Sequence, residues 1–446
     1  MIRYAFEFFI GLLLIVFALH KTDFIGFLRR TLQKMKNAEV QHEQGEVTFF
    51  TVLTLLVLLF LFAFVLFYKV AEVPIPYEID EAGMAYDAIN IVNYGVDRFM
   101  YKNPVYFINF GGGQNALYTY LAALSVRLFG YSALSLRLPA VLLSCLAALS
   151  FALLMRSVYG NAASIFGMGL FIVLPFSVMH SRWGLESYLL FPMLMISCAL
   201  FALAVRKEKT WIYAVSGISF GITLYSYALS YIIIPVLLAV CIAVLVFTKK
   251  MKWKYLFAMG IPLFLLAFPL ILLLAVNNGL IEEIRTPYIS IPKLDTYRSN
   301  DINIQNIPEN LKFNKANIFY RILFFDMLSY NAIVQYGTMY YFSLPLILWG
   351  GYITVRNAIS SLKDRKFSVD FLMTVLFLTS FLFSLMLVDI NINRTCEIFI
   401  PLFYFLCTAL TALWQKKRMA AAAAALIFII HFGSFYHYYL TDYSEE

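Results

Sequence analysis

The chain has 446 residues, of which 62% are hydrophobic and only 13% are charged. A soluble domain of this length does not need so much apolar surface, and repeated runs of about 17–25 apolar residues are typical of membrane-spanning helices. The sequence therefore predicts an all-α polytopic membrane protein. The net charge of +8 does not indicate a nucleic-acid partner, because the basic residues form short bursts rather than a continuous stripe.

About twelve membrane spans (11–13) are expected, with ends uncertain by a few residues. They lie near 4–20, 48–68, 138–155, 162–178, 188–205, 211–229, 231–248, 255–275, 339–355, 369–388, 397–414 and 419–434. The first is short and either spans the membrane or lies in its interface. Residues 1–47 form an N-terminal hydrophobic segment with a basic linker, 48–434 the membrane domain and 435–446 a short outside tail. No soluble C-terminal domain is expected.

The basic bursts set the orientation. They occupy residues 206–209, 249–254, 363–366 and 416–418. If residues 21–47 are cytoplasmic and the spans alternate, every burst falls on the cytoplasmic side, as the positive-inside rule requires. The long segments 69–137 and 276–338 then lie outside. The apolar stretch 114–129 would reverse this order if it crossed the membrane, so we expect a juxtamembrane or partly re-entrant helix there.

Four carboxylates follow the second expected span in the stretch PYEIDEAGMAYDAINIV. Helical spacing of the apolar residues predicts a short amphipathic helix over 81–94. In a purely structural interpretation, Asp80 is the N-cap and Glu81 a first-turn acid favoured by the helix dipole. The same acids could also face a cavity at the membrane surface. We expect Glu78 and Asp87 to face solvent or lipid headgroups.

A second group of ionisable residues lies in the short outside turn HSRWGLES, which contains His180, Arg182 and Glu186. A turn this short usually consists of small residues, and ionisable groups at this depth usually mark a pathway or a site. The alternative is an ion pair between Arg182 and Glu186, four residues apart at a helix start.

Two further outside turns carry polar residues. DININRT places Arg394 at the mouth of a span, where its planar fork suits phosphate oxygens or, alternatively, reaches toward headgroups. YSYALSY contains Tyr227 among tyrosines that either anchor the interface or stack against a sugar. All these groups face outside, whereas a transporter would place polar groups near the membrane midplane. The distribution favours an enzyme that works at the outer leaflet.

The motifs resemble those of the C-class membrane glycosyltransferases. The relevant stretches are IDEA, GVDRFMYKNPVYF, QNALYTYLAALSVRLFGYSALSLRLPAVL, PFSVMHSRWGLES, LYSYALSYIIIP, NAIVQYGTMYYF and NINRTCEIFIP. Within this class the chain is most similar to bacterial relatives of the dolichyl-phosphate-mannose protein mannosyltransferases and to the lipid A aminoarabinose transferase. The resemblance implies transfer of a sugar, with inversion, from a polyprenyl-phosphate donor to an acceptor outside a bacterial plasma membrane.

The resemblance also assigns roles to residues. Asp80 matches the catalytic aspartate of the first outside loop, and Glu81 adjoins it. Cations should stabilise the leaving phosphate, because it needs charge more than a proton. The substrate-binding candidates are Arg394, Arg182, Arg298, Lys102, Tyr227 and Arg137. In the oligosaccharyltransferase branch, the turn that corresponds to the one with Glu186 here supports a divalent metal. Glu186 and His180, together with Asp80, could therefore hold Mg²⁺ or Mn²⁺, whereas the mannosyltransferase branch implies no metal.

The expected partners are a polyprenyl-phosphate sugar, membrane lipids and a lipid, glycan or protein acceptor, with no nucleic acid. Two other functions fit the pattern. One is a flippase or transporter of lipid-linked glycans, and the other is an inactive scaffold of the same fold. The residues name neither the sugar nor the acceptor, because one scaffold serves many such reactions.

Overall fold

The computed structural model describes residues 46–74, 77–109, 112–295, 306–323, 328, 330–388 and 390–444. Over these ranges the chain is mostly helical with almost no sheet, which confirms the expected helical membrane fold but not the number of spans. Among the described residues, eight helices are long and apolar enough to cross a membrane, or nine if one bent pair counts as a span. The protein is therefore a multi-pass membrane protein. The expected span at 4–20, like nearly all of the segment 1–47, lies outside the described residues.

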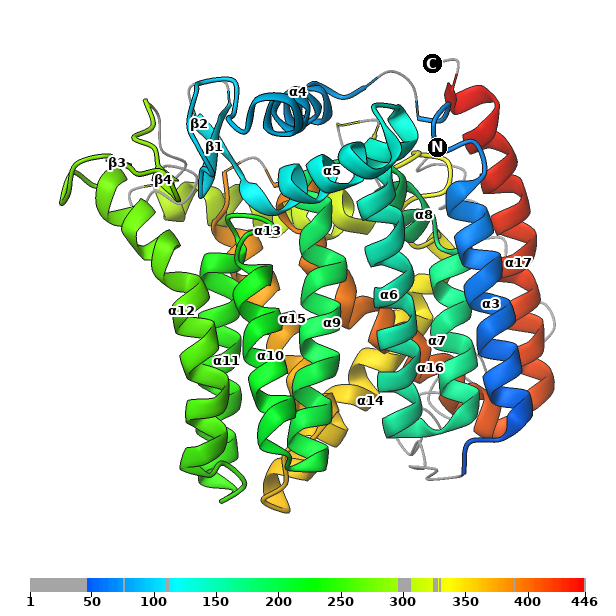
Figure 1. The fold of residues 1–446 in the computed structure, drawn as a ribbon. Coiled ribbons are helices and arrows are strands. Elements are labelled where there is room, and N and C mark those ends of the chain that lie inside the picture. The colour runs from blue at the N-terminus through cyan, green and yellow to red at the C-terminus, as the bar shows by residue number, and fades with distance from the viewer. Residues whose placement is uncertain are drawn as a thin grey trace.

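Long, roughly parallel helices form the bundle (Figure 1). They are α3 (Phe49–Phe67), α6 (Ala133–Tyr159), α7 (Asn161–Val173), α9 (Glu186–Lys207), α10 (Thr210–Thr223), α11 (Ser230–Phe247), α12 (Trp253–Asn277), α14 (Leu344–Lys363), α15 (Val369–Met386), α16 (Phe399–Lys416) and α17 (Arg418–Leu440). The eight-residue α8 (Pro175–Arg182) follows α7 at a bend of 61°. Each expected span in the described residues has a helix at its position. The count of candidate spans is nevertheless lower than twelve, because α10 has only 14 residues and the 20-residue α14 is too polar.

The remaining elements lie together at one end of the bundle, the upper end in Figure 1. They are α4 (Ile79–Tyr94), α5 (Ala116–Phe129), α13 (Ile307–Leu323), the antiparallel pair β1 (Tyr106–Asn109) and β2 (Gly112–Asn115), and the antiparallel pair β3 (Ile284–Arg285) and β4 (Ser290–Ile291). Helix α5 lies across the bundle instead of along it, and its 14 residues are too few to span a bilayer. The expected juxtamembrane helix is thus present, and the expected amphipathic helix after the second span is α4.

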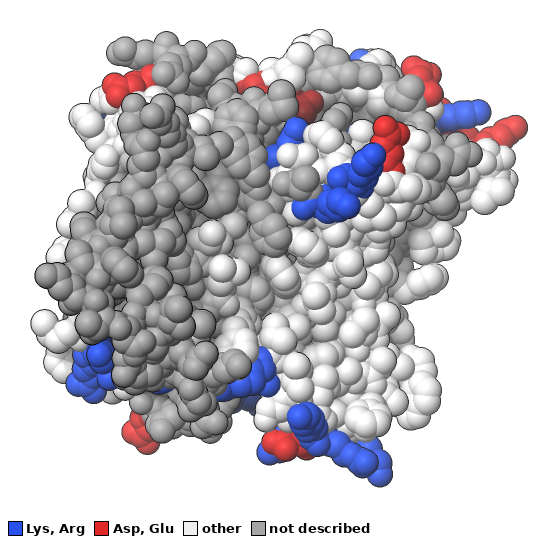
Figure 2. Space-filling view, turned by 180° about the vertical axis from the view of Figure 1, so that it is seen from behind, with Lys and Arg blue, Asp and Glu red and all other residues white. Residues whose placement is uncertain are grey.

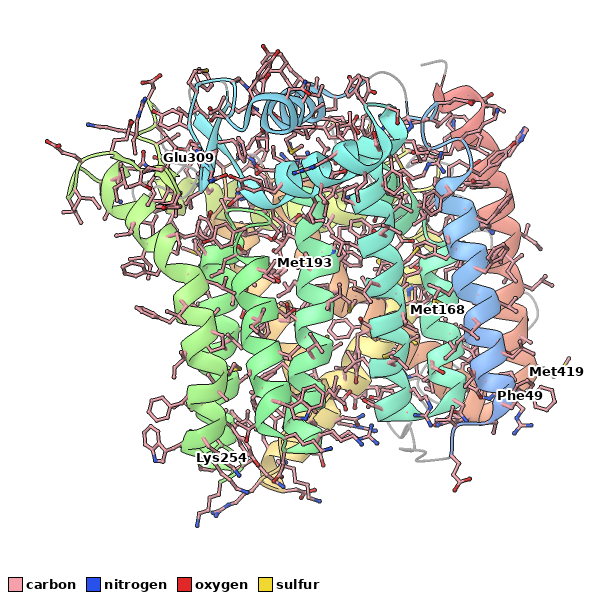
Figure 3. The ribbon with its side chains drawn as sticks, viewed as in Figure 1. Phe49, Met168, Met193, Lys254, Glu309 and Met419 are labelled. Carbon is pink, nitrogen blue, oxygen red and sulfur yellow. The ribbon has the colours of Figure 1, made fainter. Side chains whose placement is uncertain are left out.

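Charged side chains gather at the two ends of the bundle. Where described residues form the surface, Figure 2 shows an uncharged belt between two charged ends, with Lys and Arg prominent among the charges of the lower end. Lys254, in one of the basic bursts, lies at the lower end, and Glu309 lies at the upper end (Figure 3). The basic bursts therefore lie at the helix ends that are opposite α4 and α5. This placement agrees with the orientation expected from the sequence.

Helix α16 lies at the centre of the bundle, where 94% of its most apolar 18-residue stretch is buried. Its Phe403 ring packs 5.1 Å from that of Phe171 on α7. On its other side α14 crosses it closely, because a Cβ added to Gly350 would lie 1.7 Å from the backbone oxygen of Phe405. Small residues at such crossings allow helix backbones to approach in a membrane, where packing replaces the hydrophobic effect as the cause of association.

Replacing Gly350 with alanine should therefore destabilise the bundle. The added methyl group requires α14 and α16 to separate, and overpacking of this kind costs about 1–3 kcal/mol. Thermal unfolding in detergent should show a lower Tm for Gly350→Ala. Gly260→Ala on α12 is the matched control, because nothing lies within 4 Å of the new Cβ, and it should unfold like the wild type. Equal Tm values for the two variants would contradict the close crossing.

Candidate active site at the outer end of the bundle

The first turn of α4 presents Asp80. The helix begins after Glu78, whose side chain accepts a hydrogen bond of 2.6 Å from the backbone N–H of Asp80. The N-cap is thus Glu78, and the expectation that Asp80 caps the helix is wrong. Burial and the nearby Asp80 charge raise the pKa of Glu78, so this acid is not simply solvated. Asp80 lies in the first turn with its side chain partly exposed.

The β1–β2 hairpin contacts Asp80 from one face. Directly opposed residues of an antiparallel pair share a face, and the register pairs Asn109 with Gly112 and Phe107 with Gln114. From this face the Asn109 amide nitrogen donates to Asp80 Oδ1 at 3.1 Å, and the Gln114 amide nitrogen lies 3.5 Å from the Asp80 backbone oxygen. The hairpin therefore fixes one oxygen of the Asp80 carboxylate.

Asp87, a second acid of α4, supports the contact between Asn109 and Asp80 through Arg98. Asp87 is only 1% exposed and accepts from Arg98 at both oxygens, with Nη2 at 2.7 Å from Oδ2 and Nε at 3.0 Å from Oδ1. Arg98 Nη1 also donates to Asn109 Oδ1 at 3.4 Å. The expectation that Asp87 faces solvent or headgroups is wrong. A continuous chain of contacts runs from Asp87 through Arg98 and Asn109 to Asp80.

Sequence reasoning missed Arg98 and Asn109. Arg98 lies within the quoted stretch GVDRFMYKNPVYF, and Asn109 follows it closely. The available signal was an acid on the buried side of an amphipathic helix, since a buried carboxylate needs a cation or hydrogen-bond donors. The partner itself depends on how the loop after α4 folds back, which residue spacing does not reveal.

Glu81 and Arg137 form a buried ion pair. The Arg137 guanidinium donates to both Glu81 oxygens, at 2.7 and 2.8 Å, and both side chains are almost fully buried. Nη1 of Arg137 donates to the backbone oxygens of Val70 and Pro74, each at 2.9 Å. Glu81 also accepts from the Gly184 backbone N–H at 2.9 Å. In this arrangement both candidate residues connect α4 and α6 to neighbouring backbone instead of facing a substrate.

Arg182 has a similar structural partner set. It is fully buried, and Nη1 donates to the backbone oxygens of Val65 and Leu66 near the end of α3, at 2.8 and 3.0 Å. Nη2 donates to the Val73 oxygen at 2.9 Å. The guanidinium therefore satisfies carbonyl groups that a helix end leaves without partners.

The residues considered for a metal site have other partners in this structure. Glu186 accepts from the Asn115 backbone N–H, at the junction of β2 and α5. The His180 ring packs between those of Phe176 and Tyr188, with centroids 3.9 and 3.8 Å away. Within the described residues, no three His, Cys, Asp or Glu side chains are placed to hold one ion. These side chains do not fit a divalent metal site, and we assign no step to a metal.

The remaining candidates differ in their accessibility. Lys102 has an exposed side chain, and Arg394 is partly exposed with Nη1 donating to the Val388 oxygen at 2.8 Å. Tyr227 is partly buried in the turn between α10 and α11. Arg298 lies outside the described residues. Among the candidates that the structure describes, the cations with exposed surface are therefore Lys102 and Arg394.

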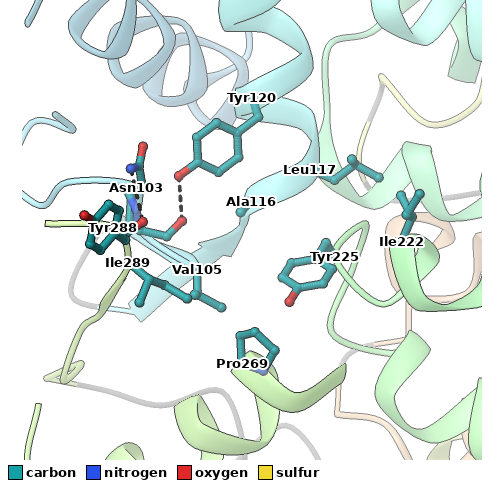
Figure 4. Close-up of a pocket in the computed structure, with 11 residues that line it drawn as sticks. Asn103, Val105, Ala116, Leu117, Tyr120, Ile222, Tyr225, Pro269, Tyr288 and Ile289 are labelled. Atoms are coloured by element: carbon teal, nitrogen blue, oxygen red, sulfur yellow. Dashed lines mark hydrogen bonds between the residues drawn. The ribbon is translucent and has the colours of Figure 1, made fainter. Parts of the chain in front are cut away.

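A pocket of about 350 Å³ opens at the base of the hairpin, between α5, α10, α12 and the β3–β4 loop (Figure 4). Val105 and Ala116, which flank the two strands, line it. Two tyrosines face it with their rings, because the Tyr120 hydroxyl donates to the Pro104 oxygen at 2.8 Å and the Tyr225 hydroxyl to the Leu266 oxygen at 2.7 Å. The wall is therefore mostly apolar and suits hydrocarbon better than a sugar.

The comparisons with known proteins concern the family and the fold. Residues 115–272 match the family model of dolichyl-phosphate-mannose-protein mannosyltransferases. The fold is similar to that of ArnT from Cupriavidus metallidurans bound to undecaprenyl phosphate, with a TM-score of 0.51 and 15% identity over 86% of this chain and 64% of that one. The resemblance to C-class membrane glycosyltransferases is confirmed.

Two structures of the Archaeoglobus fulgidus oligosaccharyltransferase are similar as well. The complex with Zn and sulfate gives a TM-score of 0.50 at 15% identity, over 88% of this chain and 53% of that one. The form tethered to an acceptor peptide gives 0.51 at 12% identity, over 89% and 55%. The chain thus spans less than two thirds of the length of these relatives. No curated protein sequence matches it significantly.

Breaking the buried ion pair should be costly for stability. Arg137→Leu leaves the Glu81 carboxylate buried without its cation, and loss of one partner of such a pair costs about 3–5 kcal/mol. We expect a markedly lower Tm in detergent for this variant. The double variant Glu81→Leu with Arg137→Leu should recover part of the loss, because no charge then remains buried.

The exposed pair of Lys250 and Glu208 gives the matched control. Its atoms are 2.9 Å apart but more than a third of each side chain is exposed, and such pairs contribute at most about 1 kcal/mol. Lys250→Ala should therefore unfold near the wild-type temperature. A single Arg137 variant as stable as Lys250→Ala would refute the role assigned to the buried pair.

Proposed function

We propose that the protein transfers a sugar from a polyprenyl-phosphate donor to an acceptor at the outer face of the membrane, with inversion at the anomeric carbon. The observation that carries this proposal is the setting of Asp80. Its carboxylate is partly exposed and is held through one oxygen by Asn109, which belongs to the hairpin whose base lines an apolar pocket. The family match and the fold support the reaction class.

In the proposed reaction Asp80 is the general base. The oxygen that Asn109 does not hold accepts the proton of the acceptor hydroxyl, whose oxygen attacks the anomeric carbon. The bond from that carbon to the phosphate oxygen breaks, and its electron pair leaves with the phosphate. Lys102 and Arg394 are the described cations proposed to stabilise the departing anion, since a phosphate leaving group needs charge and not a proton.

The pocket at the hairpin base is proposed to hold the first isoprene units of the carrier. Val105 lies at the base of β1 and Asn109 at its end, so about 13 Å of strand separates the pocket wall from the Asp80 contact. In this proposal a phosphate and one sugar ring would span that length between the hydrocarbon and the carboxylate. ArnT, which has this fold, was crystallised with undecaprenyl phosphate.

Asp80→Asn should abolish most of the transfer. The variant keeps the shape of the side chain but cannot accept a proton. Loss of a general base lowers the rate roughly 10²–10⁴-fold. The assay is the formation of a new glycosidic bond by purified protein given a polyprenyl-phosphate hexose. Glu72→Gln, at an exposed acid before α4, is the matched control and should retain activity. Equal transfer by wild type and Asp80→Asn would refute the mechanism.

Filling the pocket should affect donors according to their chain length. Ile222→Trp adds bulk to the pocket wall, so the KM for a long polyprenyl-phosphate donor should rise, while a donor with a short, water-soluble chain should be used as before. Val215→Trp, also on α10 but away from the pocket lining, should change neither KM. A rise for both donors in Ile222→Trp would contradict the assignment of hydrocarbon to this pocket.

A further inference from the structure

The β3–β4 hairpin presents large apolar side chains at the outer end of the bundle. Tyr288 at its turn is 86% exposed, and Leu280, just before the first strand, is 77% exposed. Figure 1 shows the hairpin beyond the end of α12, beside the bundle and level with α5. A water-facing surface gains little from such side chains, whereas a lipid surface would cover them.

The side chain of Tyr288 is exposed although its backbone is fixed. The Thr286 hydroxyl accepts from the backbone N–H groups of Tyr288 and Ile289, at 3.3 and 3.0 Å, and the Asn103 amide donates to the Tyr288 oxygen at 3.1 Å. The hairpin is also joined to the first outside loop, because Arg285 Nη2 donates to the Tyr101 hydroxyl at 2.7 Å. The backbone that carries the Tyr288 ring is thus held by hydrogen bonds within the hairpin and to the first outside loop.

Exposed apolar residues cover α12 and recur in the hairpin that follows it in the chain. Only 22% of the most apolar 18-residue stretch of this helix is buried, the second lowest share among the candidate spans of the described residues. Its exposed apolar residues recur at helical spacing as Phe257, Ile261, Phe264, Leu265, Phe268, Ile271 and Leu274. After the helix ends at Asn277, Leu280 and Tyr288 are again exposed.

The hairpin also carries charges suited to the headgroup layer. Glu283 and Arg285 form an ion pair with each other, and Glu282 is exposed beside them. Tyrosine is enriched at membrane interfaces, where its ring contacts hydrocarbon and its hydroxyl meets water. Paired charges, an exposed tyrosine and an exposed leucine therefore match a zwitterionic lipid surface better than a strongly charged protein partner.

We propose that the β3–β4 hairpin docks on the outer leaflet, with Tyr288 and Leu280 inserted at the boundary between headgroups and acyl chains. The partner is the lipid surface itself, and this inference depends only on α12 crossing the membrane and not on the proposed reaction. One consequence concerns the pocket, because Tyr288 and Ile289 form part of its wall. Docking would hold that wall at the level of the outer leaflet.

The experiment measures the depth of single labelled positions. Tyr288→Cys and Leu280→Cys carry an NBD label, in a background with Cys145→Ser because the other four cysteines are buried. The full chain is reconstituted in phosphatidylcholine vesicles with nitroxide lipids, spin-labelled either near the headgroup or deep in the acyl chain. Tyr94→Cys on α4 is the control, since Tyr94 is 75% exposed at the outer end but distant in the chain from α12.

We expect the shallow nitroxide to quench the labels at 280 and 288 at least twofold more than the deep one, with little quenching at 94 by either. A label at 288 that is quenched no more than the one at 94 would overturn the proposal and indicate a water-facing or protein-binding hairpin. Stronger quenching by the deep nitroxide would also overturn it, because the hairpin would then lie within the hydrocarbon.

Discussion

The ion pair between Glu81 and Arg137 fixes the position of the candidate site. Arg137 belongs to a bundle helix, whereas Glu81 belongs to α4, which lies on top of the bundle. Asp80 precedes Glu81 directly in the chain, so the pair also determines where Asp80 lies. A buried ion pair gives little net stability, since desolvation offsets most of the attraction, but it strongly disfavours arrangements that separate the two charges. Here it ties α4 to the membrane domain.

The two buried arginines together organise the chain between α3 and α4. Arg182 donates to carbonyl groups at the end of α3, and Arg137 donates to carbonyl groups of the following segment. A helix end near the membrane surface leaves backbone acceptors without partners, and two guanidinium groups supply donors for them. The candidate base is thus oriented by cations that serve the backbone. This explains why the two arginines are buried although the sequence pattern placed them beside a substrate.

Much of the fold could be predicted from the sequence because hydrocarbon runs and basic bursts are direct consequences of the bilayer. The orientation argument also identified α5 as a helix that does not cross. The site was harder to predict. The helix over 81–94 was predictable from spacing, but the partner of each acid was not, because Arg98 and Arg137 meet α4 only after the chain folds back. The number of spans is not confirmed, in part because a helix such as α10 is short.

The contact between Arg98 and Asn109 makes the two oxygens of Asp80 unequal. A guanidinium can only donate, so the end of the Asn109 amide that faces Arg98 must be its oxygen, and the nitrogen must face Asp80. The amide cannot rotate by half a turn without opposing donor to donor and acceptor to acceptor. The hydrogen bond to Asp80 therefore has a fixed polarity, in which Asn109 donates to Oδ1 and Oδ2 lacks this contact.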